Sequence, residues 1–76
     1  QGNANAQFNL GLMYDQGLGV PQDLAYAHMW LNIAASNGHE NAGKARDEVA
    51  KLMTPAQIEK AQDLARECVR KEYKGC

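Results

Sequence analysis

A short internal repeat constrains this chain more than any other feature. Gly2-Asn3-Ala4-Asn5-Ala6 aligns with Gly38-His39-Glu40-Asn41-Ala42 at an offset of 36 residues, and the Gly, the second Asn and the last Ala match. With two residues of the connecting loop omitted, the offset becomes 34. Five apolar residues, Leu24, Ala27, Trp30, Leu31 and Ala34, then fall on Ile58, Ala61, Leu64, Ala65 and Cys68. A period of about 35 is typical of helical solenoids. The sequence therefore predicts an all-α chain with four helices in two antiparallel hairpins.

Local signals predict the helix ends. In the first unit, residues 1–37, we expect helices at about 4–16 and 22–37. The first of these ends before Gly17, because glycine adopts a positive φ at little cost. In the second unit, residues 38–76, we expect helices at about 40–53 and 55–72, followed by a short tail. The run Thr54-Pro55-Ala56-Gln57 has the pattern of a capping box with a proline in the first turn, so it predicts where the fourth helix begins.

The helices differ in how much apolar surface they carry. The second helix is apolar on one side through Leu24, Ala27, Trp30, Leu31 and Ala34, and on the other through Tyr26, Met29 and Ile33. Such a helix needs neighbours on two sides. The third and fourth helices each carry one stripe, formed by Ala42, Ala45, Val49 and Leu52 and by Ile58, Ala61, Ala65 and Cys68. We therefore expect an internal repeat with an open N-terminal side, followed by a degenerate C-terminal capping pair.

Charge and hydropathy argue against two classes of partner. Eight Lys and Arg against nine Asp and Glu give a net charge of −1, which does not favour binding of nucleic acid through its phosphates. No segment has the length and apolar character needed for membrane insertion.

Candidate chemistry is sparse. Ser36 lies in the last turn of the second helix and Thr54 caps the fourth, so both have structural roles. His39 begins a zinc-protease-like motif, but Gly43 stands where the second His belongs. We expect His28 on a helix surface and His39 in a loop. The sequence predicts no metal site, no cofactor and no catalytic activity.

A set of small, glycine and aromatic positions covering about residues 2–42 resembles the Sel-1-like repeat family, relatives of tetratricopeptide repeats. The residues that carry the resemblance are Ala6, Leu10, Gly11, Tyr14, Gly17, Gly19, Val20, Asp23, Ala27, Trp30, Ala34, Ala35, Gly38 and Ala42. The resemblance implies a right-handed α-α superhelix that acts as an adaptor for other proteins and has no chemistry of its own. It also implies a C-terminal fragment of a bacterial repeat protein. In the second copy, Arg46, Asp47, Ala50 and Met53 replace Leu10, Gly11, Tyr14 and Gly17, which suits a cap.

The first helix has two different faces. Ala6, Leu10, Met13 and Tyr14 point one way, and Leu10 and Tyr14 are expected in the core with Trp30. Gly11 costs about 1 kcal/mol against Ala inside a helix, so we expect a close helix crossing there. The resemblance implies that the other face lines a concave groove. The partner-binding candidates are Asn5, Phe8, Leu12, Asp15 and Gln16, continued by Asn41, Lys44 and Glu48.

Two functional hypotheses follow. In the first, the chain is a non-enzymatic interaction module whose groove suits an extended peptide. In the second, it caps a longer array or self-associates through the open N-terminal side, and Phe8 and Leu12 pack on a preceding repeat. Enzymatic activity is a distant third.

Cys68 and Cys76 form the remaining informative pair. Seven residues separate them, and Gly75 lets the chain turn back onto the end of the fourth helix. A bridge would close a loop of about nine residues and stabilise the chain by roughly 2.5 kcal/mol. We favour this bridge, and with it a periplasmic or secreted location. The alternative is a buried Cys68 with a reduced thiol at Cys76, which is compatible with the cytoplasm.

Overall fold

The computed structural model describes residues 3–76 and contains four helices and no strand in that range. Gln1 and Gly2, with which the predicted first unit and the repeat alignment begin, lie outside the described residues. The helices are α1 (Ala4–Gln16), α2 (Leu24–Ser36), α3 (Ala42–Ala50) and α4 (Pro55–Arg70). The predicted fold class, an all-α chain with four helices, is therefore confirmed. The third helix is shorter than expected at both ends, and the fourth ends two residues earlier than expected.

Short polar residues begin three of the helices. The side chain of Asn3 accepts a hydrogen bond from the backbone N–H of Ala6 at 3.0 Å, and that of Asp23 accepts one from Tyr26 at 3.1 Å. The predicted capping box is confirmed at α4. There Thr54 Oγ1 accepts from the Gln57 N–H at 3.1 Å, and Gln57 Oε1 accepts from the Thr54 N–H at 2.8 Å. Each cap satisfies backbone donors that have no partner inside the helix.

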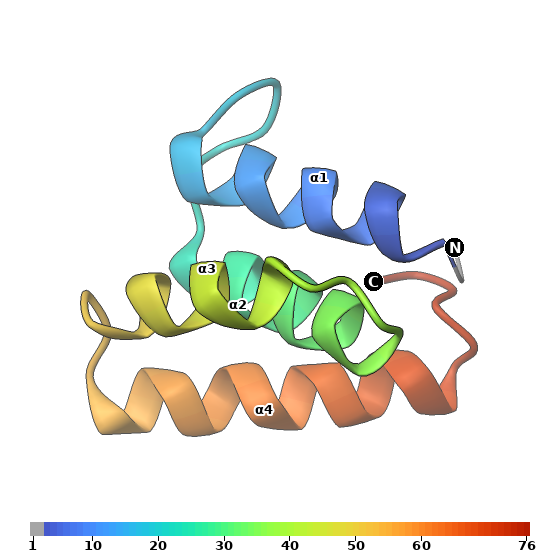
Figure 1. The fold of residues 1–76 in the computed structure, drawn as a ribbon. Coiled ribbons are helices and arrows are strands. Elements are labelled where there is room, and N and C mark those ends of the chain that lie inside the picture. Colours follow the sequence, from blue (N-terminus) through green and yellow to red (C-terminus); the bar gives the residue numbers. More distant parts are fainter. Residues whose placement is uncertain (1–2) are drawn as a thin grey trace.

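α2 is the central helix of the fold. It lies between α1 and α4 and beside α3, and it makes the main contacts with all three (Figure 1). The expectation that this helix needs apolar neighbours on two sides is confirmed, because residues all around it are buried. They are Ala27, His28, Met29, Trp30, Leu31, Ile33 and Ala34. Half of the buried hydrophobic residues of the described chain lie on this helix, so its burial is a large part of the hydrophobic stabilisation.

Gly11 sets the distance between α1 and α2. A Cβ atom at this position would lie 2.8 Å from both Cγ and Cδ2 of Leu31 and 3.2 Å from its backbone nitrogen. These separations are too short for a real side chain, so only glycine lets α1 approach α2 so closely. The predicted close crossing is confirmed.

The predicted inward face of α1 is partly wrong. Ala6 and Met13 are exposed, whereas Gln7 is only 2% exposed. Its Oε1 accepts a hydrogen bond from Asn37 Nδ2 at 2.9 Å, and that amide also donates to the Tyr73 hydroxyl at 3.3 Å. This contact lets a polar side chain occupy the helix interface at little cost.

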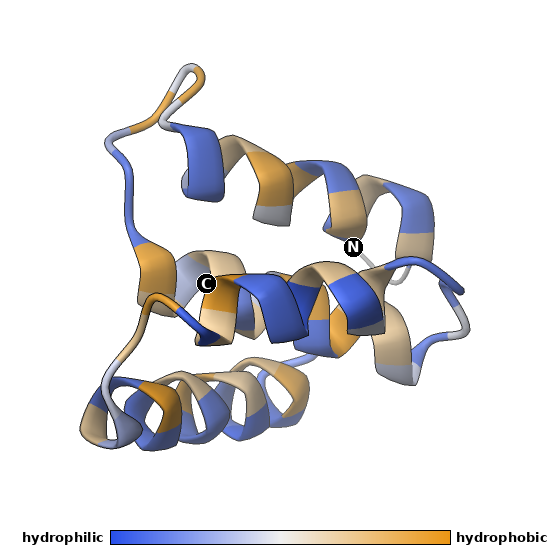
Figure 2. Cartoon of the chain, turned by 60° about the vertical axis from the view of Figure 1, so that its left-hand side comes forward, coloured by the Kyte–Doolittle hydropathy of each residue, from blue (hydrophilic) through white to orange (hydrophobic). Residues whose placement is uncertain are grey.

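The end of α3 also differs from the prediction. Because the helix stops at Ala50, Leu52 is not on its apolar stripe and is 71% exposed, while Met53 turns inward and is buried. The stripe of α4 is confirmed, with Ala61, Ala65 and Cys68 buried. Hydrophobic and hydrophilic residues alternate along this helix, the lowest in Figures 1 and 2.

Candidate functional site

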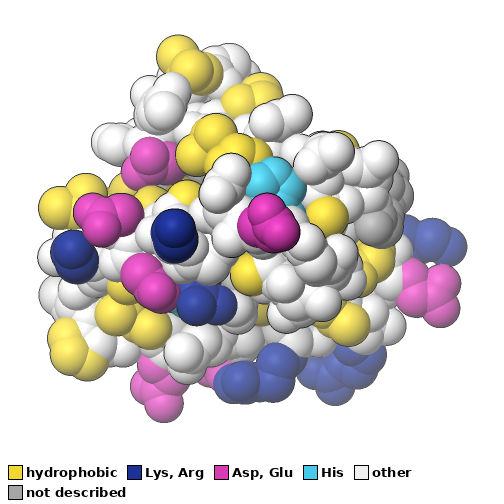
Figure 3. Space-filling model, in the orientation of Figure 1, with side chains coloured by type: hydrophobic (Ala, Val, Ile, Leu, Met, Phe, Trp, Pro, Cys, Tyr) yellow, Lys and Arg dark blue, Asp and Glu magenta, His cyan; other side chains and the backbone are white. Residues whose placement is uncertain are grey.

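A groove of about 470 Å³ runs between α1 and α3, and we call it the α1–α3 groove. It forms because both helices pack mainly on α2 rather than on each other. α1 contributes Leu12 and Asp15. α3 and the turn after it contribute Ala45, Glu48, Val49, Lys51 and Leu52. Figure 3 shows this side of the molecule, with apolar side chains between separate acidic and basic groups.

The floor of the groove is part of the hydrophobic core. Val49 is buried, and Leu12 and Ala45 pack at the edge of the same cluster. Phe8, one turn before Leu12, also packs on this cluster, and its ring stacks on His39 with centroids 4.0 Å apart. Phe8 and Leu12 therefore have partners within the chain itself, although both side chains remain partly exposed.

The charges of the groove are unevenly paired. Lys51 Nζ lies 3.1 Å from Glu48 Oε2, and both side chains are more than two-thirds exposed. Asp15 lies in the last turn of α1, where the carbonyl ends of the helix already produce a negative potential. No basic residue of the described chain forms an ion pair with it. The α1 side of the groove is therefore negative.

The structure brings together three of the eight predicted binding residues. Leu12, Asp15 and Glu48 line the groove, and Phe8 lies half-buried beside its floor. The other four are exposed but do not line it: Asn5, Gln16, Asn41 and Lys44. Sequence reasoning did not assign the other four lining residues to the groove. It placed Ala45, Val49 and Leu52 on the apolar stripe of the third helix, and it placed Lys51 within that helix. The sequence did hold a signal for the earlier helix end. The Thr54 cap begins the next helix only two residues after Leu52, which leaves Leu52 in the turn.

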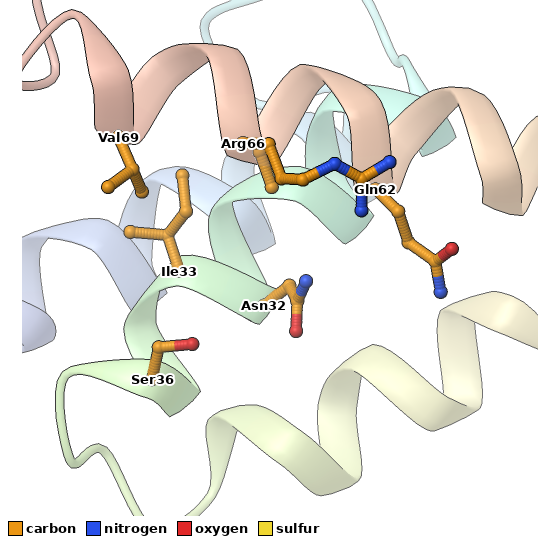
Figure 4. Close-up of a pocket in the computed structure, with 7 residues that line it drawn as sticks. Asn32, Ile33, Ser36, Gln62, Arg66 and Val69 are labelled. Carbon is orange, nitrogen blue, oxygen red and sulfur yellow. The ribbon is translucent and has the colours of Figure 1, made fainter.

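A second hollow, of about 530 Å³, lies between α2 and α4 (Figure 4). Its apolar part is formed by Ile33, Ala65 and the half-exposed Val69. Its rim is polar, with Asn32, Ser36, Gln62 and Arg66. Two of these polar groups already have partners in the chain. Asn32 Oδ1 accepts from Arg46 Nη1 at 2.8 Å, and Arg66 pairs with Asp63.

Among the described residues, His28 is the one titratable side chain that is buried. The predicted surface position is wrong, because the side chain is 4% exposed on the enclosed helix α2. Burial lowers the pKa of His28 below its ordinary value of 6.5, and the Arg46 guanidinium lowers it further. The Asp47 carboxylate acts in the opposite direction. His28 Nδ1 has no hydrogen-bond partner among the described residues, so a neutral imidazole is favoured there.

The described residues contain no group of three or more His, Cys, Asp or Glu that could hold a metal ion. Ser36 is the last residue of α2 and Thr54 caps α4, as predicted. No described helix has the length and hydropathy required to cross a lipid bilayer.

The tail after α4 turns back onto the fold. Sγ of Cys68 and Sγ of Cys76 lie 2.00 Å apart, at the distance of a disulfide bond. Glu72, Tyr73 and Gly75 adopt positive φ angles, which reverse the chain direction. Tyr73 and Cys76 pack on the buried cluster that contains Met29 and Ile33. The tail thus covers part of the second apolar side of α2.

Comparisons with known proteins agree with the all-helical fold. Residues 4–39 match the family model described as the Sel1 repeat. The chain is similar to Chitin synthase regulatory factor 3 of Schizosaccharomyces pombe, with 42% identity over 50 residues. That stretch covers 66% of this chain and 5% of the length of the relative. No solved structure matches the chain.

Proposed function

Because residues 4–39 form a Sel1 repeat, we propose that this chain is a non-enzymatic interaction module that binds a protein or peptide segment in the α1–α3 groove. Helical repeats of this kind commonly present binding surfaces to other proteins. The relative is named a regulatory factor, a description compatible with such a role. The matched stretch makes up 5% of that protein.

The observation that carries the proposal is the exposed Leu52 at the edge of an apolar floor. Its side chain is 71% exposed beside the groove that Leu12 and Val49 line. A large apolar side chain next to an apolar depression is typical of an interaction surface. Asp15 and Glu48 add polar groups that can orient a partner.

The test selects peptides from a random phage-displayed library on the chain and maps their contacts by NMR chemical shifts. We expect the shifts to cluster on groove residues, and Leu52→Ser to weaken binding. Leu18→Ser is the matched control, because Leu18 is also exposed, at 57%, but lies in the α1–α2 loop outside the groove. Equal loss of binding in both variants, or selection of no groove-binding peptide, would contradict the proposal.

A second candidate function is a structural cap of a repeat array. The outward residues of α4 that support it are Glu59, Lys60, Asp63, Arg66 and Arg70, all exposed. Charged outer faces are typical of terminal capping repeats. The open N-terminal side would then carry self-association or the neighbouring repeat. Sedimentation equilibrium separates the two functions, because the interaction module alone requires no self-association.

We also propose that the Cys68–Cys76 bridge forms in the natural protein and that the protein works in an oxidising compartment, periplasmic or extracellular. The structure pairs Cys68 with Cys76, and bridges of this kind persist in oxidising compartments. Intact mass after alkylation without reductant tests it. Two alkylated thiols in freshly isolated protein would favour the cytoplasmic alternative.

A further inference from the structure

We propose that the α1–α3 groove selects partner segments in which an apolar side chain lies next to a basic one. This inference rests on the proposed function and adds the chemistry of the partner. It is carried by three observations: the position of Asp15, the weak internal pairing of the other charges, and the apolar contact offered by Leu52.

Asp15 lies at a position where an acidic side chain is unfavourable for the stability of the helix. It lies in the last turn of α1, which contains no basic residue, so its carboxylate adds to the negative end of the helix dipole. Its backbone carbonyl oxygen accepts a hydrogen bond from Gln22 Nε2 at 2.7 Å, but no cation in the described chain pairs with the carboxylate. A Lys or Arg side chain from a partner would supply the missing positive charge.

The remaining charges of the groove leave this site negative. Lys51 is the only cation among the lining residues, and it pairs with Glu48. Both side chains of this pair are more than 70% exposed, so their attraction is screened by water and holds them weakly. Two carboxylates against one ammonium give the groove a net negative charge, which favours a cationic partner over an anionic one.

The apolar half of the recognition comes from the opposite edge. Leu52 lies in the turn after α3, whereas Asp15 lies on α1, and Leu12 and Val49 line the same groove. An apolar partner side chain in this depression would bury Leu52. The neighbouring basic side chain would then lie on the Asp15 side of the groove.

Asp15 gives a test that separates recognition from folding. Asp15→Asn removes an unfavourable charge at the C-terminal end of α1, so the variant should be at least as stable as the parent chain in urea denaturation. The same change should weaken binding of a basic-apolar peptide by about threefold to tenfold, the range of a partly exposed ion pair. A residue that only supported the fold would not show opposite effects in these two measurements.

Three synthetic peptides of equal length serve as probes, each with the same apolar residue followed by Lys, Gln or Glu. Binding is followed by fluorescence anisotropy with the full 76-residue chain. Glu59→Gln is the matched control, since Glu59 is an exposed acid on α4 outside the groove. We expect the Lys peptide to bind best, to lose affinity between about 0.01 M and 1 M salt, and to lose affinity in Asp15→Asn but not in Glu59→Gln.

The outcomes distinguish the two proposals. The preference for a basic residue is wrong if the three peptides bind equally, or if Asp15→Asn binds the Lys peptide as well as the parent chain does. If that binding still depends on Leu52, the interaction function stands. If neither these peptides nor the library yields binding in the groove, the interaction function itself fails, and the basic preference fails with it.

Discussion

The crossing of α1 over α2 gives the sharpest test of the structure, through Gly11→Ala. Alanine in a helix is favoured over glycine by about 1 kcal/mol. Here the added Cβ would lie 2.8 Å from two side-chain atoms of Leu31 and 3.2 Å from its backbone nitrogen. Overpacking of this kind costs about 1–3 kcal/mol. The steric cost exceeds the helical gain, so we expect the free energy of unfolding to fall by about 1 kcal/mol, or about 4–8 °C in Tm.

Gly43→Ala is the matched control for this experiment. Gly43 also lies in a helix, but the nearest atom to an added Cβ is an Arg46 guanidinium nitrogen at 3.7 Å, an ordinary contact. We expect this variant to be more stable than the parent by up to about 1 kcal/mol. Urea denaturation followed by far-UV circular dichroism compares the two. If Gly11→Ala proved as stable as Gly43→Ala, the proposed reason for the close crossing would be refuted.

Three further changes test other parts of the fold. Because burial lowers the pKa of His28 in the folded state, the unfolded chain binds its proton more tightly. The contribution of the neutral His28 to the free energy of unfolding should therefore be fully present above pH 6.5, the ordinary pKa. It should fall as the pH drops from that value towards the lowered pKa of the folded state, and stay constant at lower pH. Melting curves recorded across this range test the expectation. A His28→Gln variant should lose most of that pH dependence. Reduction of the Cys68–Cys76 bridge should lower the free energy of unfolding by about 2.5 kcal/mol, and Cys76→Ser should reproduce the loss and no longer respond to reductant. Thr54→Ala should cost about 1 kcal/mol in the same assay by removing the cap that pairs with Gln57, whereas an unchanged stability would mean that the cap is dispensable.

The features that the sequence predicted well depend on residues close together in the chain. The start of α4 needs only Thr54, Pro55 and Gln57, and the end of α1 needs only the positive φ of Gly17. Gly11 was also predicted correctly, because a glycine inside an amphipathic helix has an energetic cost that a close crossing explains. At the two helix ends the physical cause acts within a few residues. At Gly11 only the signal is local, because the contact that explains it, with Leu31, lies on α2.

The features that the sequence did not predict depend on distant partners. Gln7 is buried because Asn37, thirty residues away, donates a hydrogen bond to it. His28 is buried because α1, α3 and α4 enclose α2 on several sides, which hydrophobic periodicity alone does not reveal. A polar residue on a core helix can be buried with a hydrogen-bond partner or exposed to water. The apolar pattern of the sequence does not tell these two cases apart.

The candidate site shows the same limit. Leu12 and Asp15 were among the candidates because the resemblance assigns one face of the first helix to a groove, and Glu48 was included as a continuation of that set on the third helix. Lys51 and Leu52 were missed because α3 ends at Ala50 rather than at Met53. Helix ends are the least certain part of a sequence-based prediction, and here one helix end decides which side chains form the edge of the site.

The geometry of the groove therefore follows from the way α2 holds its neighbours. Gly11 brings α1 close to α2, and α3 packs on the same helix, so that the groove lies between two helices that share one support. Leu12 directly follows the glycine at the crossing, and Asp15 follows one turn later. A larger residue at Gly11 that the fold tolerated would displace both groove residues together. A change at the crossing would therefore alter both the stability of the fold and the shape of the groove. At Asp15 the two effects oppose each other, because the negative charge that suits a basic partner destabilises the C-terminal end of the helix.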